Sequence, residues 1–104
     1  MIAIDSEIQA KDLKSALDKF WQLSAEKISA IEKEYPQNQG SPVFTVDGKY
    51  ATRGWTEWTQ GFQFGSSILQ FDATGEKSFL EKGKLKTHQY MAPHISHTGV
   101  HDHG

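Results

Sequence analysis

The sequence predicts an all-α protein of three helices, with an elaborated loop or small β-hairpin between the first two. Apolar residues recur at steps of three, four and seven in three separate segments, which is the period of a helix with one apolar face. Pro36, Gly75 and Pro93 end these segments, because proline and glycine are the strongest local breakers of helices. A chain of 104 residues has room for one small domain.

The first helix is predicted over about residues 6–35. Ser6 can act as its N-cap, with Asp5 and Asp12 as alternative starting points, and Pro36 ends it because the residue before a proline is disfavoured in the α conformation. Lysines and glutamates fill one side of this helix, and the apolar residues share the other: Leu13, Leu17, Phe20, Trp21, Ile28, Ile31 and Tyr35.

The segment 37–54 has a different character, since it is rich in glycine, proline, asparagine and aspartate. Residues 43–46 and 49–52 are β-branched or aromatic in part, and they flank Asp47-Gly48, a dipeptide typical of tight hairpin turns. We therefore expect a structured loop with a two-stranded excursion and not a linker between domains.

The second helix is predicted over residues 55–74, with Thr56 as N-cap and Gly75 as the left-handed residue that ends it. It is apolar nearly all round, so we expect it to be buried on most sides. Two partner helices are not enough to cover it, and an apolar face left exposed normally marks an interaction surface. The apolar residues form two neighbouring stripes: Trp58, Phe62, Gly65 and Leu69 in one, and Phe64, Ile68 and Phe71 in the other.

The third helix is predicted over residues 76–91, with a weaker pattern that Gly83 interrupts. Pro93 ends it, and the remaining residues have the composition of a loop. The apolar contacts of this helix are expected from Phe79, Leu80, Leu85, Tyr90 and Met91.

Composition excludes several classes of protein. With 11 basic residues, 13 acidic residues and a formal charge of -2, the chain lacks the excess of base that a nucleic-acid-binding protein would show. No apolar run approaches the roughly 20 residues that span a membrane, and no secretion signal is visible at the N-terminus. The absence of cysteine excludes disulfides, thiolate metal sites and a cysteine nucleophile, and it leaves the cellular compartment open.

An aromatic cluster beside glycines occupies residues 55–65 and includes Trp58. Exposed rings at the start of a helix make a platform on which sugar rings stack, although aromatic residues at helical spacing more often form the core. Arg53, just before this cluster, has a planar fork that can receive a carboxylate, or it is an ordinary surface residue.

A second cluster near the C-terminus combines four histidines with Asp102. The spacings of two and three residues between His94, His97 and His101 are compatible with metal ligands on a helix, yet Gly99 and Pro93 argue against a helix there. Alternatively, Asp102 between His101 and His103 is a carboxyl group suited to general acid–base catalysis. The third alternative is a polar tail exposed to solvent.

Three motifs in this order resemble the start of the unsaturated glucuronyl hydrolases, which are glycoside hydrolase family 88, and of the related family 105 enzymes. The resemblance covers about residues 10–104, and it depends on the order and spacing of all three motifs. The motifs are Arg53-Gly-Trp-Thr-Glu-Trp-Thr-Gln-Gly-Phe-Gln-Phe-Gly, then Leu69-Gln-Phe-Asp-Ala-Thr-Gly-Glu, and finally His97-Thr-Gly-Val-His-Asp-His-Gly.

This resemblance implies an α/α toroid of six helical hairpins, and an enzyme that removes an unsaturated uronic acid from the oligosaccharides that polysaccharide lyases produce. In that family an Asp protonates the C4=C5 enol ether, and the reaction needs no metal or cofactor. Asp102 would be this proton donor and acceptor, Trp58 an aromatic of the sugar site, and His101 a neighbour of Asp102. Residues 1–104 would then be the N-terminal portion of a single incomplete domain, inactive alone because the second carboxylate of the site lies later in the family's chains.

A non-catalytic reading stays open beside the enzyme. The chain would be a helical module that associates through its exposed apolar helix, with His97 and His101 binding zinc or nothing. In either reading we expect the isolated chain to self-associate through the helix at residues 55–74, with neither nucleic acid nor a membrane as partner.

Overall fold

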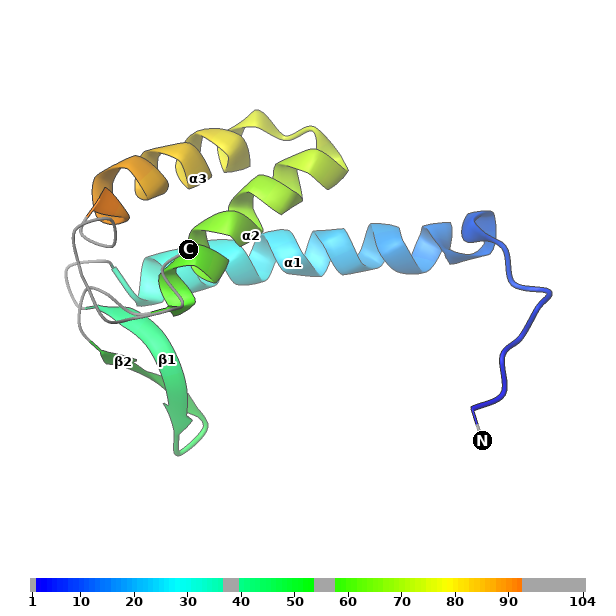
Figure 1. Ribbon diagram of the computed structural model, residues 1–104, viewed down its shortest axis with the longest axis horizontal. Helices are drawn as coiled ribbons and strands as arrows, with labels where there is room; N and C mark the ends of the chain where they lie inside the picture. Colours follow the sequence, from blue (N-terminus) through cyan, green and yellow to red (C-terminus); the bar gives the residue numbers. More distant parts are fainter. Residues whose placement is uncertain (1, 37–39, 54–57, 93–104) are drawn as a thin grey trace.

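The computed structural model describes residues 2–36, 40–53 and 58–92. The described part is mostly helical, with a two-stranded antiparallel hairpin between the first two long helices, as the sequence predicts (Figure 1). The elements in chain order are the short 3-10 helix η1 (Ala10–Leu13), α1 (Lys14–Glu34), β1 (Ser41–Val46), β2 (Lys49–Arg53), α2 (Thr59–Thr74) and α3 (Lys77–Tyr90).

The first helix begins later than the sequence predicts. The Asp5 carboxylate accepts a hydrogen bond from the Glu7 backbone N–H at 2.9 Å, which holds these residues in a turn that competes with a helix. Gln9 is the N-cap of η1, and its backbone N–H donates to Asp12 Oδ2 at 2.9 Å. The predicted start at about residue 6 is therefore wrong, since η1 begins at Ala10 and α1 at Lys14.

The hairpin turn follows the prediction for Asp47-Gly48. Both residues have positive φ, 49° for Asp47 and 75° for Gly48, as a two-residue turn with the twist of a hairpin requires. The register pairs Thr45 with Tyr50, and it shifts by one residue at Val43, between the pairs made by Pro42 and Phe44. The hairpin lies beside the C-terminal end of α1 (Figure 1).

Helices α2 and α3 form an antiparallel pair joined by a tight turn (Figure 1). Gly75 has a φ of 74°, and its N–H donates to the Phe71 carbonyl at 2.7 Å, so this glycine ends α2 as predicted. The predicted first residues of this helix, including the N-cap Thr56, lie outside the described residues. The described part of α2 begins at Thr59, with Trp58 in the N-cap position.

Gly83 is a weak helix former, but it lets α2 and α3 pack closely. A Cβ atom at this position would lie 2.6 Å from Ile68 Cγ1 and 3.1 Å from the Phe64 carbonyl oxygen. The backbones of α2 and α3 therefore approach each other at this glycine, which is buried. The residue that interrupts the sequence pattern of α3 is the residue that allows the helix pair to close.

The apolar core of the described residues is small. Phe64 and Phe79 are its buried hydrophobic side chains, whereas many large hydrophobic side chains on every element are exposed. The radius of gyration is 16.7 Å, against roughly 13 Å for a compact domain of this length. Much of this expansion comes from α1, whose first half projects beyond the other helices (Figure 1). Among the described residues, no helix is long and apolar enough to span a membrane.

Candidate functional site

Arg53 lies at the end of β2, where it is exposed. Its guanidinium carbon is 5.3 Å from the centre of the Phe44 ring on the neighbouring strand, a cation–π arrangement. Stacking of this kind fixes the plane of the guanidinium group but leaves its N–H groups free to point outward. The geometry is compatible with a carboxylate-binding role, since Arg53 has no ion pair with a described residue.

Trp58 lies at the N-terminus of α2 and is 50 % exposed. Its ring meets the Phe62 ring edge to face, with 5.7 Å between the ring centres. Because half of the indole faces solvent, plain core packing does not account for this residue within the described structure. A half-exposed indole held by a second ring is a surface on which an apolar ligand face can stack.

The α2 stripe, which we define as Trp58, Phe62, Gly65 and Leu69, faces away from the other helices. Phe62 is 72 % exposed and Leu69 is 60 % exposed. No atom lies within 4 Å of where a Cβ would stand on Gly65 or on the neighbouring Gly61, so the surface between the large side chains is open. The expectation that this helix is buried on most sides is wrong for the described structure.

The buried side of α2 is largely polar: Gln60, Ser67 and Gln70 are buried there together with Phe64. Gln70 donates from Nε2 to the backbone carbonyl of Trp21 on α1 at 2.9 Å. A helix of this composition would normally face its apolar side inward. In α2 the polar side faces α1 and the apolar α2 stripe faces solvent. This orientation is the reverse of the one that an amphipathic helix adopts in a small domain that is stable alone.

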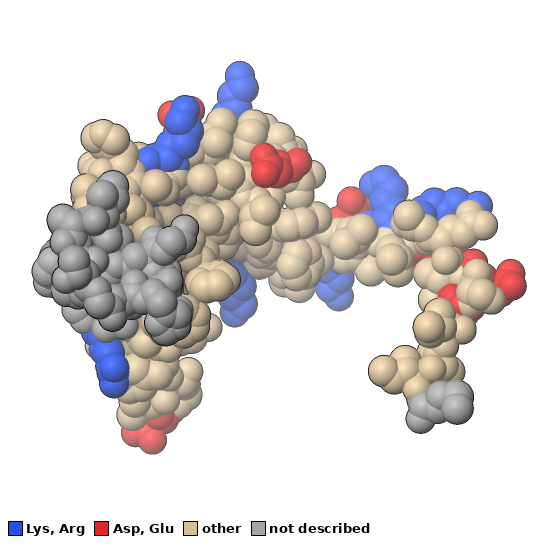
Figure 2. Space-filling view, viewed as in Figure 1, with Lys and Arg blue, Asp and Glu red and all other residues tan. Residues whose placement is uncertain are grey.

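The two salt bridges between described residues lie on α1 and between α1 and α3, away from the α2 stripe. A salt bridge of 3.1 Å joins Lys82 on α3 to Glu32 on α1, and Lys14 pairs with Asp18 one turn apart on α1. On the face that Figure 2 shows, side chains of both signs lie along the projecting part of α1 and over α3, without a broad patch of one sign. Asp72, three residues after Leu69, is the charged residue of α2, and the four residues of the α2 stripe carry no charge.

The catalytic and histidine predictions fall outside the described residues. Asp102 and His101 lie there, together with His94, His97 and His103. Among the described residues, no group of three or more histidine, aspartate or glutamate side chains is arranged to hold a metal ion. Of the four predicted site residues, the structure places Arg53 at the end of β2 and Trp58 at the N-cap of α2, and it does not describe the other two.

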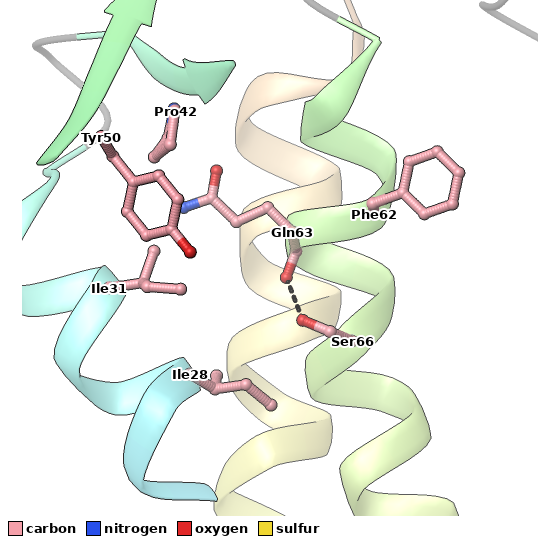
Figure 3. Close-up of a pocket in the computed structure, with 7 residues that line it drawn as sticks. All are labelled: Ile28, Ile31, Pro42, Tyr50, Phe62, Gln63 and Ser66. Carbon is pink, nitrogen blue, oxygen red and sulfur yellow. Dashed lines mark hydrogen bonds between the residues drawn. The ribbon is translucent and has the colours of Figure 1, made fainter. Parts of the chain in front are cut away.

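A pocket of about 280 Å³ lies between α1, the hairpin and α2, and the sequence patterns do not predict it. Its lining includes Ile28 and Ile31 from α1, Tyr50 from β2 and Gln63 from α2. Figure 3 shows the Gln63 side chain extending from α2 toward Tyr50, while the Phe62 ring points away from the other labelled side chains. Gln63 has no recognisable sequence signal, because a single glutamine in a helix is ordinarily a surface residue.

No protein-family model, curated protein or solved structure matches the chain.

Proposed function

We propose that this chain is the N-terminal portion of a carbohydrate-active hydrolase that releases unsaturated uronic acid from lyase-generated oligosaccharides. The order of the three motifs supports the proposal, and the observation that carries it is the exposed α2 stripe. An apolar stripe that ends at a half-exposed Trp58 needs more protein beside it and offers an aromatic ring at its open end.

The architecture is compatible with part of an α/α toroid. Such a toroid is a ring of antiparallel helix pairs, and α2 and α3 form one pair of this kind. In the ring, each pair is flanked by others, so a neighbouring pair would cover the α2 stripe. The small core of Phe64 and Phe79 is then the inner part of a larger core.

The chemistry of the proposal is the hydration of an enol ether. Asp102 donates a proton to C4 of the C4=C5 bond, and the resulting carboxylate accepts a proton from the water that adds at C5. The hemiketal formed at C5 then collapses and releases the remaining sugar. Trp58 supplies a ring for sugar stacking, His101 lies beside Asp102, and the Arg53 fork receives the uronate carboxylate. This mechanism uses no metal or cofactor.

An activity assay tests the proposal. The substrate is an unsaturated disaccharide, and the measured signal is the loss of the ultraviolet absorbance of its enol ether. We expect activity from a protein that continues through the rest of the toroid and none from the 104-residue chain, because three helices cannot enclose the cavity. An inactive complete protein would reject the assignment, and activity of the isolated chain would reject its incompleteness.

The exposed α2 stripe also favours a second candidate, a non-catalytic module that associates through this helix and binds metal through its C-terminal histidines. Titration of the chain with zinc, followed by calorimetry, distinguishes the two. Stoichiometric binding that His97→Ala and His101→Ala both abolish would favour the module. Absence of binding, together with activity of the complete protein, would favour the hydrolase.

Self-association of the isolated chain is expected in both cases. The double variant Phe62→Lys/Leu69→Lys should shift the chain toward monomer and change the free energy of unfolding by no more than about 0.5 kcal/mol, because both side chains are exposed. Sedimentation velocity at micromolar concentrations measures the association. Leu85→Lys is the matched control, since Leu85 is 53 % exposed on α3 and outside the stripe. A wild-type chain that sediments as a monomer would contradict the expectation, as would an equal effect of Leu85→Lys.

A further inference from the structure

The carboxamide of Gln63 is an unexplained polar group. Its two polar atoms, Oε1 and Nε2, are buried and have no hydrogen-bond partner among the residues that the structure describes. One hydrogen bond is nearby, from Ser66 Oγ to the Gln63 backbone carbonyl at 2.8 Å, and it leaves the side chain unpaired. Buried polar groups are nearly always paired in folded proteins, so an amide with both atoms unpaired calls for a partner.

The pocket beside this amide has the right size and character to supply one. Its volume of about 280 Å³ is near the lower end of the range for small-molecule sites, roughly 300–1,000 Å³. Ile28, Ile31 and Pro42 make its walls apolar, and the half-exposed ring of Tyr50 forms one side of it. The lining contains no charged residue, so an ionic ligand would lose its hydration without gaining an opposite charge.

We propose that this pocket binds a small neutral lactam, in which a cis amide in a ring adjoins an apolar body. The cis geometry places the N–H donor and the carbonyl acceptor on the same side, where they face the complementary acceptor and donor of a glutamine carboxamide. The Gln63 Nε2–H donates to the ligand carbonyl, and the ligand N–H donates to Gln63 Oε1. The apolar body of the ligand lies against Ile28, Ile31 and Tyr50.

The ligand reaches the amide through a local adjustment. The Gln63 amide atoms are out of contact with water, and the side chain extends from α2 toward Tyr50 (Figure 3). The last torsion of a glutamine side chain has a broad energy minimum, so turning the amide plane toward the pocket costs little torsional energy. Neither Arg53 nor Trp58, the two predicted site residues that the structure describes, lines the pocket, so this inference does not depend on the proposed hydrolase.

A pair of aromatic probes tests the hydrogen bonds separately from the apolar walls. Oxindole carries the cis amide in a ring, and its lactone analogue coumaranone has the same shape with an ester oxygen in place of the N–H. We expect the chain to bind the lactam about tenfold more tightly, since the lactone leaves Gln63 Oε1 unpaired. Chemical shifts of the Ile28 and Ile31 methyl groups in titrations followed by NMR report binding at the pocket itself.

The variant Gln63→Met keeps the length and the apolar stem of the side chain but removes the amide. In this variant the preference between the two probes should disappear, and both should bind more weakly than the lactam binds to the wild-type chain. Gln89→Met is the matched control, because Gln89 is exposed on α3 and outside the pocket. It should retain the tenfold preference. Equal binding of both probes to the wild-type chain, a preference that survives Gln63→Met, or an absence of shifts at the two isoleucines would each overturn the proposal.

Discussion

In the proposed hydrolase, replacing Asp102 by asparagine is expected to lower the turnover of an unsaturated disaccharide by about 10³-fold, within the range that general acid–base catalysis contributes. Asparagine has the same shape as aspartate but no acidic proton, so it cannot protonate C4 of the enol ether. The initial rate of loss of ultraviolet absorbance measures the effect. Substrate binding should change little, because asparagine keeps the size and shape of the aspartate side chain.

Asp72→Asn is the matched control for this experiment. Asp72 is exposed near the C-terminal end of α2, and no role in the proposed site falls to it. Its substitution should leave the rate unchanged. Full activity of the Asp102→Asn enzyme would remove Asp102 from the mechanism, whereas equal losses in both variants would point to a general effect of charge and not to proton transfer.

Replacing Gly83 by valine is expected to destabilise the chain by about 3 kcal/mol, which is the upper part of the range for overpacking a well-packed site. The Cβ of the new residue would stand 2.6 Å from Ile68 Cγ1, and the Phe64 carbonyl oxygen at 3.1 Å is backbone that cannot move aside easily. The helix pair α2–α3 would have to separate. Urea unfolding followed by circular dichroism measures the loss.

Gly65→Ala provides the comparison, because Gly65 is also a helical glycine. Among the described residues, no atom lies within 4 Å of the position where its Cβ would stand. Alanine there should stabilise the chain by up to about 1 kcal/mol through its higher helical propensity. The opposite signs of the two effects separate packing from propensity. A Gly83→Val chain as stable as wild type would show that α2 and α3 are not in contact at this point.

Local chemistry made several elements predictable from the sequence. The Asp47-Gly48 turn and the left-handed Gly75 depend on backbone preferences of single residues, and both are confirmed. Pro36 likewise limits α1, which ends at Glu34 within one residue of the prediction. The start of α1 escaped prediction because Asp5 and Asp12 each accept a hydrogen bond from a nearby backbone N–H, and the sequence alone does not say at which of them the helix begins.

The orientation of α2 was not predictable for a different reason. Helical periodicity shows that the face with Phe62 differs from the face with Gln70, but it does not say which face meets α1. The sequence interpretation expected most sides of this helix to be buried and one apolar face to stay exposed. The Gln70–Trp21 hydrogen bond holds the face with Gln70 against α1. The pocket at Gln63 depends on that orientation and on the position of the hairpin, so no local pattern encodes it.

The N-terminal part of α1, which projects beyond the other helices, should unfold locally. Residues 14–20 are all exposed, and a helical stretch without tertiary packing is only marginally stable in water. Its backbone amides should exchange with deuterium through fraying from the free end, without any opening of the rest of the protein. From Trp21 onward, where Gln70 of α2 donates a hydrogen bond to the helix, exchange should slow sharply. The amide protons of one continuous helix thus fall into two regions with different exchange rates, and the boundary between them marks where tertiary contacts begin.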